Sequence, residues 1–197
     1  MKKDNISSNI IMGLFAGSIL FISSIFILLE IGNPKFILTL NLPFLFFIFI
    51  YELYRNTKSP FKNIAFTLLG IIYVSLPLTL LNFIAFYPNK TYNAELVLCI
   101  FILLWTFDTS AYLIGKRFGK HLLFERISPK KTWEGTIGGG LLCILTAYIL
   151  SAVFLQLPFY NWTVIAFIII IMGSLGDLVE SLLKRSIDIK DSGTVLP

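Results

Sequence analysis

Of the 197 residues in this chain, 56% are hydrophobic and only 14% are charged, whereas soluble domains carry about 25% charged residues. A chain this apolar has too few polar residues to form a surface that faces water. This excludes a soluble globular protein, and a lipid bilayer is the natural solvent of the chain. The net charge of +5 comes from Lys and Arg that lie between or beyond apolar runs. Basic residues in such places meet anionic headgroups, so nucleic-acid binding is not expected.

Six apolar runs approach the length of about 20 residues that a helix needs to cross the hydrocarbon core. The sequence therefore predicts an all-α integral membrane protein, a polytopic bundle of about six transmembrane helices. Residues 1–93 hold three spans with few motifs, and residues 94–197 hold the polar clusters described below. The runs are Ile10–Ile31, Phe36–Tyr54, Ile64–Phe86, Ala94–Tyr112, Ile137–Leu157 and Trp162–Val179.

The distribution of basic residues predicts the orientation of these spans. With a cytoplasmic N-terminus, fourteen Lys and Arg fall in inner segments and two, Lys35 and Lys90, fall in outer loops. The inner segments include one long loop, residues 115–136, and a polar tail after Val179. The polar clusters all lie on this inner side, so the chemistry is expected at the cytoplasmic face of the cell (inner or plasma) membrane.

The first cluster begins with Asp108, at the inner end of the fourth run. A carboxylate at membrane depth is costly and usually faces a cavity and a partner. Asp108 and Tyr112 are four residues apart and share a helical face. The alternative is that Asp108 simply ends the span among the headgroups.

The second cluster lies in the long loop, where a Ser128-Pro dipeptide precedes Lys130, Lys131 and Thr132. A glycine-rich helix start, Gly135–Gly140, follows. Adjacent lysines, a hydroxyl and a helix N-terminus can together hold phosphates through charge and backbone N–H groups. The alternative is a basic loop beside anionic lipid, with the glycines serving close helix packing.

The third cluster places Asp177 and Lys184 on one helical face, followed by Arg185, Lys190 and Asp191. A carboxylate with basic residues one to two turns away suits a metal-bridged phosphate site. Mg²⁺ prefers oxygen ligands and usually takes only one or two carboxylates. The alternative is an ordinary ion pair between Asp177 and a basic residue at a span end.

Together these clusters resemble the membrane phosphatidate cytidylyltransferases, also called CDP-diacylglycerol synthases. The resemblance covers roughly residues 94–197, and the third cluster is its most specific part. In that family the third motif continues through a further element that contributes a second metal-binding aspartate. The chain printed here stops at Pro197, so a truncated product with half a metal site is expected. The matching stretches are Asp108–Lys120, Ile127–Gly135, and Gly176–Arg185 followed by Lys190 and Asp191.

The resemblance implies a reaction of CTP with phosphatidic acid that gives CDP-diacylglycerol and pyrophosphate, with Mg²⁺ as cofactor and a second metal left open. CTP, phosphatidic acid and membrane lipids are the implied partners, and a homodimer is allowed. The implied catalytic residues are Asp177, which also binds the metal, Lys184, Arg185 and Asp191. The implied substrate-binding residues are Asp108, Ser128, Lys130, Lys131, Thr132, Glu134 and Lys190.

Two other functions are considered. A CTP-dependent polyprenol or lipid kinase would use similar nucleotide binding but would transfer a different phosphoryl group. A small transporter would use Asp108 and Asp177 as an ion path across the bilayer. The outer halves of the spans contain almost no polar residues, which argues against the transporter.

Overall fold

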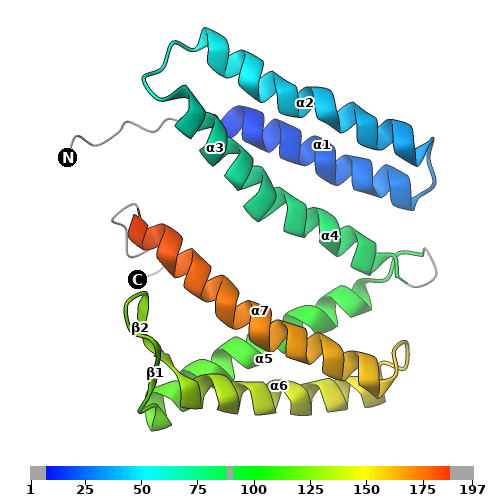
Figure 1. The fold of residues 1–197 in the computed structure, drawn as a ribbon. Coiled ribbons are helices and arrows are strands. Elements are labelled where there is room, and N and C mark those ends of the chain that lie inside the picture. Colours follow the sequence, from blue (N-terminus) through cyan, green and yellow to red (C-terminus); the bar gives the residue numbers. More distant parts are fainter. Residues whose placement is uncertain (1–7, 88–90, 187–197) are drawn as a thin grey trace. The chain divides into compact units, whose positions relative to one another are not determined.

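The computed structural model describes residues 8–87 and 91–186, which form helices and a β-hairpin (Figure 1). In this part of the chain, six helices are long and apolar enough to cross a membrane. The hairpin pairs strand β1 (Leu122–Phe124) antiparallel with strand β2 (Ser128–Thr132). The six helices are α1 (Ile10–Leu28), α2 (Pro34–Tyr54), the continuous run of α3 (Pro60–Gly70), η1 (Ile71–Ser75) and α4 (Leu76–Ala85), then α5 (Ala94–Phe118), α6 (Trp133–Val153) and α7 (Phe159–Ser186).

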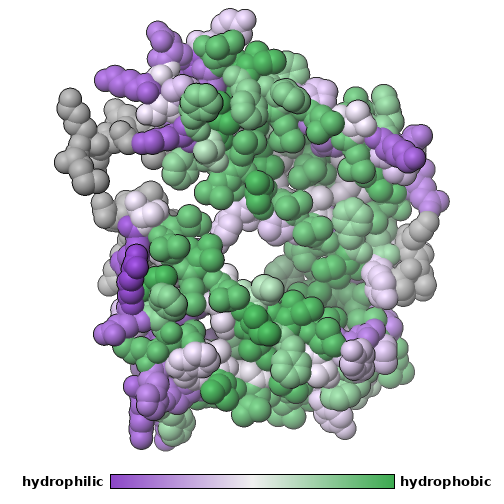
Figure 2. Space-filling view, in the orientation of Figure 1, coloured by the Kyte–Doolittle hydropathy of each residue, from purple (hydrophilic) through white to green (hydrophobic). Residues whose placement is uncertain are grey.

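The predicted all-α membrane class is confirmed. Large apolar side chains stay exposed along the helices, among them Ile11 at 79% and Leu53 at 77%. Figure 2 shows hydrophobic side chains over the helix surfaces, whereas hydrophilic ones gather at helix ends and around the hairpin. An apolar surface of this extent needs lipid around it. The chain is therefore a multi-pass membrane protein.

Several helices extend beyond the apolar runs that predicted them. Helix α5 continues to Phe118 instead of ending at Tyr112, and α6 begins at Trp133 instead of Ile137. The hairpin occupies much of the segment between them, which was expected to be a loop. Hydropathy indicates where a helix leaves the lipid, but hydrogen bonding decides where the helix ends. Asp108 consequently lies inside α5, about 15 Å before the helix ends at 1.5 Å per residue.

The third span contains a π-helical turn, η1, just before Pro77. The N–H of Leu76 donates to the carbonyl of Ile71, one residue further back than in an α-helix. Pro77 has no N–H and its ring crowds the preceding turn. A wider turn relieves that crowding while most backbone groups keep partners inside the helix, as lipid requires.

The chain divides into two compact units, residues 1–97 and residues 98–197. In the first unit α1 packs against α2, η1 and α4, around a small core of Ala16, Ile48 and Ile71. Of these three side chains Ala16 is small, and it leaves room for the two isoleucines to pack against α1.

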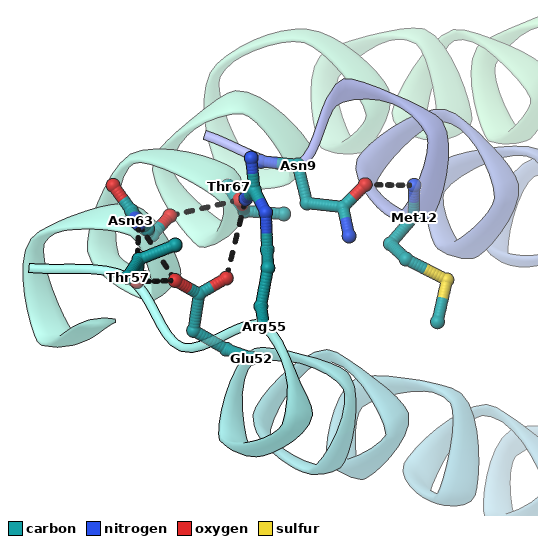
Figure 3. Close-up of polar contacts among 7 residues, drawn as sticks. All are labelled: Asn9, Met12, Glu52, Arg55, Thr57, Asn63 and Thr67. Carbon is teal, nitrogen blue, oxygen red and sulfur yellow. Dashed lines mark hydrogen bonds and ion pairs between the residues drawn. The ribbon is translucent and has the colours of Figure 1, made fainter. Parts of the chain in front are cut away.

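A buried carboxylate, Glu52, lies at one end of the first unit (Figure 3). Its side chain accepts hydrogen bonds from the Thr57 hydroxyl at 2.5 Å and from Asn63 Nδ2 at 2.6 Å. Arg55 contacts the other carboxylate oxygen at 3.3 Å. Glu52 is only 4% exposed, so these donors replace the water that it has lost. The contacts fix the connection between α2 and α3.

The second unit rests on a close approach between α5 and α6. A Cβ atom added at Gly139 would lie 2.8 Å from the backbone nitrogen of Ala111, and one at Gly135 would lie 2.6 Å from its carbonyl oxygen. On α7, a Cβ atom added at Gly173 would lie 3.6 Å from the Phe107 ring of α5. The glycine-rich start of α6 therefore serves close helix packing, the second of the two roles considered above, and it brings α6 beside the segment of α5 that carries Asp108.

We expect Gly139→Ala to destabilise the second unit, because its methyl group would meet the backbone of α5. Overpacking typically costs about 1–3 kcal/mol, offset in part by the gain of about 1 kcal/mol in helix propensity. Gly140→Ala is the matched control, since its Cβ would contact only the flexible Ile170 side chain at 3.4 Å. Thermal unfolding in detergent should show a lower midpoint for Gly139→Ala alone. Equal midpoints for the two variants would contradict this packing.

Candidate functional site

A pocket of about 580 Å³ opens in the second unit among α5, α7 and the junction of β2 with α6. Its wall combines apolar side chains with two carboxylates, three lysines and several hydroxyl groups. Elements that are distant in the sequence thus converge on one cavity. The lining residues are Phe107, Asp108, Ala111, Tyr112, Lys116, Ser128, Lys130, Lys131, Thr132, Thr136, Ser174 and Asp177.

An ion pair between Lys131 and Asp177 joins the hairpin to α7 at this pocket. The Asp177 side chain is 47% exposed and that of Lys131 is 26% exposed, so solvent or a ligand can reach both. Sequence reasoning considered an ion pair for Asp177 with a basic residue at the same span end. Lys184 instead pairs with Glu180, one turn earlier on α7, at 2.7 Å.

Helix α5 presents Asp108, Tyr112 and Lys116 to the pocket at successive intervals of four residues. The Lys116 ammonium lies 5.9 Å from the centre of the Tyr112 ring, within reach of a cation–π interaction. Asp108 therefore faces a cavity from within α5, as predicted for a carboxylate at membrane depth, and it does not mark the end of the helix.

The junction of β2 with α6 places Ser128, Lys130, Lys131 and Thr132 beside one another. Thr132 is the N-cap of α6, because its hydroxyl oxygen accepts the N–H of Gly135 at 3.2 Å. This acceptor role satisfies one of the unpaired N–H groups at the start of the helix. The O–H group of Thr132 remains as a hydrogen-bond donor to a phosphate in the pocket.

Glu134, in the first turn of α6, holds the chain just before the hairpin. Its carboxylate accepts the backbone N–H groups of Lys120 at 3.1 Å and His121 at 3.2 Å, and it lies 2.6 Å from His121 Nδ1. The N–H of Trp133 returns a bond to the carbonyl of His121 at 2.9 Å. Glu134 does not line the pocket, so its contacts position the hairpin that carries the lysines.

The structure brings together most of the predicted site residues and separates others. Six of them, Asp108, Ser128, Lys130, Lys131, Thr132 and Asp177, line the one pocket. Glu134, Lys184 and Arg185 do not line it, and Lys190 and Asp191 lie outside the described residues.

Sequence reasoning did not single out Thr136 and Ser174 as site residues, although both line the pocket. Helical spacing would have indicated them. Thr136 lies one turn after Thr132, and Ser174 lies one turn before Asp177.

The two aspartates of the pocket bring carboxylate oxygens to its wall from different helices. No group of three or more His, Cys, Asp or Glu side chains with metal-binding geometry occurs in residues 8–87 and 91–186. Asp108 and Asp177 alone still fit Mg²⁺, which usually keeps several waters and binds through one or two carboxylates plus substrate phosphates.

The sequence of the chain matches the Cytidylyltransferase family over residues 1–197. The chain belongs to this family. It is similar to curated proteins named phosphatidate cytidylyltransferase from Staphylococcus aureus (strain COL), at 37% identity, and Staphylococcus haemolyticus (strain JCSC1435), at 38% identity. A relative of the same name from Staphylococcus epidermidis is 35% identical. Each match covers 154 residues, which is 77% of this chain and 57% of the relative.

The family resemblance drawn from the sequence is thus confirmed. Each of the three clusters on which it rested contributes residues to the pocket of this cytidylyltransferase-family chain. Asp108 comes from the first cluster, Lys130 and Lys131 come from the second, and Asp177 comes from the third. The residues that identified the family in sequence are therefore neighbours in space.

We expect Glu134→Ala to loosen the hairpin of this cytidylyltransferase-family chain. The variant removes the acceptor for two backbone N–H groups, and each lost hydrogen bond costs about 0.5–1.5 kcal/mol. Hydrogen–deuterium exchange should speed up at the amides of Lys120 and His121. The control is His121→Ala, which removes one side-chain contact but leaves both amide bonds in place. Exchange that is equally slow in Glu134→Ala and wild type would show that this carboxylate does not hold the hairpin.

Proposed function

We propose that this chain serves the transfer of a cytidylyl group from CTP to phosphatidic acid, which gives CDP-diacylglycerol and pyrophosphate. The pocket is the observation that carries this proposal. It holds lysines and carboxylates side by side at the polar end of helices whose sides are apolar. A water-soluble nucleotide and a lipid phosphate can meet in such a place. The names of the relatives support the same reaction.

In this reaction a phosphate oxygen of phosphatidic acid attacks the α-phosphorus of CTP. The new phosphorus–oxygen bond forms as the bond from the α-phosphorus to the bridging oxygen breaks, and pyrophosphate leaves with that electron pair. Such a transfer depends mainly on positioning and on neutralising phosphate charge. We assign Lys130 and Lys131 to the triphosphate, with Ser128 and the O–H proton of Thr132 as further donors.

We assign Asp177, together with Asp108, to the binding of Mg²⁺, which when bound would offset the negative charge of the triphosphate. Lys131 forms an ion pair with Asp177. Lys131 also lines the pocket, so its ammonium group can bind a phosphate held there. Lys184 and Arg185 remain proposed partners of the lipid phosphate. Lys190 and Asp191 remain proposed members of the same site, and a homodimer remains a prediction.

The proposed site faces the cytoplasm, across the plasma membrane from the outer loops. The fourteen-to-two distribution of Lys and Arg supports this orientation. CTP would then reach the pocket directly from the cytoplasm, while phosphatidic acid would enter from the surrounding leaflet.

We expect Asp177→Asn to reduce cytidylyl transfer at least a hundredfold, because the amide keeps the shape but loses the charge that binds the cation. The assay uses the protein in vesicles that contain phosphatidic acid, with CTP labelled at the α-phosphorus and Mg²⁺. The exposed hairpin-turn variant Glu125→Gln is the control. Label that enters lipid only from γ-labelled CTP would indicate a lipid kinase and would overturn the proposal. Normal transfer by Asp177→Asn would overturn the assignment of Asp177.

We expect Lys131→Met to weaken CTP binding about tenfold to a hundredfold, as is usual when a hydrogen bond to a charged group is lost. Equilibrium dialysis of labelled CTP against the purified protein measures this directly and does not require turnover. Lys58→Met, at an exposed site in the first unit, controls for the loss of one positive charge. Equal affinities in the two variants would remove Lys131 from the nucleotide site.

A further inference from the structure

The proposed reaction brings two phosphate-bearing molecules into one pocket, CTP and phosphatidic acid. Lys130 and Lys131 of the hairpin are assigned to the triphosphate. Neither Lys184 nor Arg185 lines the pocket, and Lys184 pairs with Glu180 on α7 at 2.7 Å. The lipid phosphate therefore needs a further cation at the place where it reacts.

Lys116 provides such a cation. Among the described residues it is the third lysine of the pocket wall, and it comes from helix α5 instead of the hairpin. Its ammonium lies 5.9 Å from the centre of the Tyr112 ring, one turn earlier on α5, so the side chain leans back along the helix. Tyr112 in turn lies about 6 Å along the helix from Asp108. The ammonium thus faces the part of the pocket where the metal and the reacting phosphates are proposed.

The side of α5 that carries Lys116 becomes apolar further into the span. Five residues recur along it at intervals of three or four, so they share one helical face. Of these, Trp105 is 64% exposed and Phe101 is 37% exposed, and the centres of their rings lie 6.2 Å apart. The face therefore offers aromatic surface within the span and a cation near the end of the helix. Its residues are Phe101, Trp105, Asp108, Tyr112 and Lys116.

A lipid that ends in a phosphate matches this order of groups. Its acyl chains lie in the hydrocarbon core and its phosphate lies among the headgroups, where basic and aromatic side chains gather. A nucleotide has no acyl chain to cover Trp105. The phosphate of phosphatidic acid is also a monoester, with a charge of about −1.5 to −2 at pH 7, whereas a phosphodiester lipid such as phosphatidylglycerol carries one negative charge. A cation at the pocket wall therefore favours the monoester.

We propose that Lys116 binds the phosphate of phosphatidic acid in the pocket, while an acyl chain of the same lipid lies against Trp105 and Phe101. Lys116 thus selects the phosphomonoester from the other anionic lipids of the membrane and holds it beside CTP. The identity of the lipid rests on the proposed cytidylyl transfer. Binding of the lipid requires no CTP, however, so it can be measured separately from the reaction.

Lipid binding is measured first, without nucleotide. Native mass spectrometry of the full chain gives its affinities for dioleoyl phosphatidic acid and for dioleoyl phosphatidylglycerol. We expect Lys116→Met to bind phosphatidic acid about tenfold more weakly, as the loss of a hydrogen bond to a charged group predicts, with a smaller change for phosphatidylglycerol. Arg117→Met, at the next and exposed residue of α5, should bind both lipids as the wild type does. Equal affinities of the wild type and Lys116→Met for phosphatidic acid would overturn the proposal.

Further measurements separate the lipid phosphate from other phosphates. In equilibrium dialysis Lys116→Met should bind labelled CTP as tightly as the wild type, and an excess of inorganic phosphate should not displace phosphatidic acid from the wild type. Lys116→Arg, which keeps the charge, should retain most of the affinity for phosphatidic acid. Weaker CTP binding by Lys116→Met with unchanged lipid binding would assign Lys116 to the nucleotide and overturn the inference. Loss of lipid binding in Lys116→Met, from a wild type that transfers no cytidylyl group, would overturn the proposed function alone.

Discussion

The hydrocarbon core of a bilayer offers no water to a polar group, and this constraint shapes both units of the chain. Glu52 is buried and accepts bonds from neighbouring side chains at the end of its unit. Asp177, on a long apolar helix, meets Lys131 from the hairpin. Thr132 supplies an acceptor for the start of α6. Because lipid excludes water from the middle of each span, each of these polar groups is matched by a partner from a neighbouring side chain or element.

The pocket of the second unit combines a rigid frame with an exchangeable contact. Gly139 and Gly135 bring the backbones of α5 and α6 so close that even a methyl group does not fit. The ion pair between Lys131 and Asp177 is partly exposed, and exposed pairs contribute only about 0–1 kcal/mol. A ligand can therefore replace this pair at little cost, whereas the helices around it keep their places. Such a division suits a site that must bind and release charged molecules.

The sequence was sufficient to predict the helices, because runs of apolar residues report directly on contact with lipid. It also indicated Asp108, Lys131 and Asp177, since charged residues within or beside such runs are rare and need a reason. The hairpin and the contacts of Glu134 could not be predicted. They depend on bonds between the backbone of Lys120 and a carboxylate fourteen residues later, and no periodic pattern records such a pairing. The glycine-rich segment was open to two interpretations until the distances to α5 favoured packing.

The π-helical turn in the third span determines where that span can lose a residue. Contacts along α1 lie on both sides of η1, with Thr67 bound to Asn9 before it and Asn82 bound to Ser24 at 2.8 Å after it. Each residue of an α-helix turns the chain by about 100°, and a π turn contains one residue more than an α turn needs. Deleting a single residue from Ile71–Ser75 would let the π turn close to an α turn, so α4 would keep Asn82 on the side of α1. A deletion in the regular helix on either side of η1 would instead turn the residues after it by about 100°. The third span should therefore tolerate the loss of one residue within η1 better than elsewhere along its length.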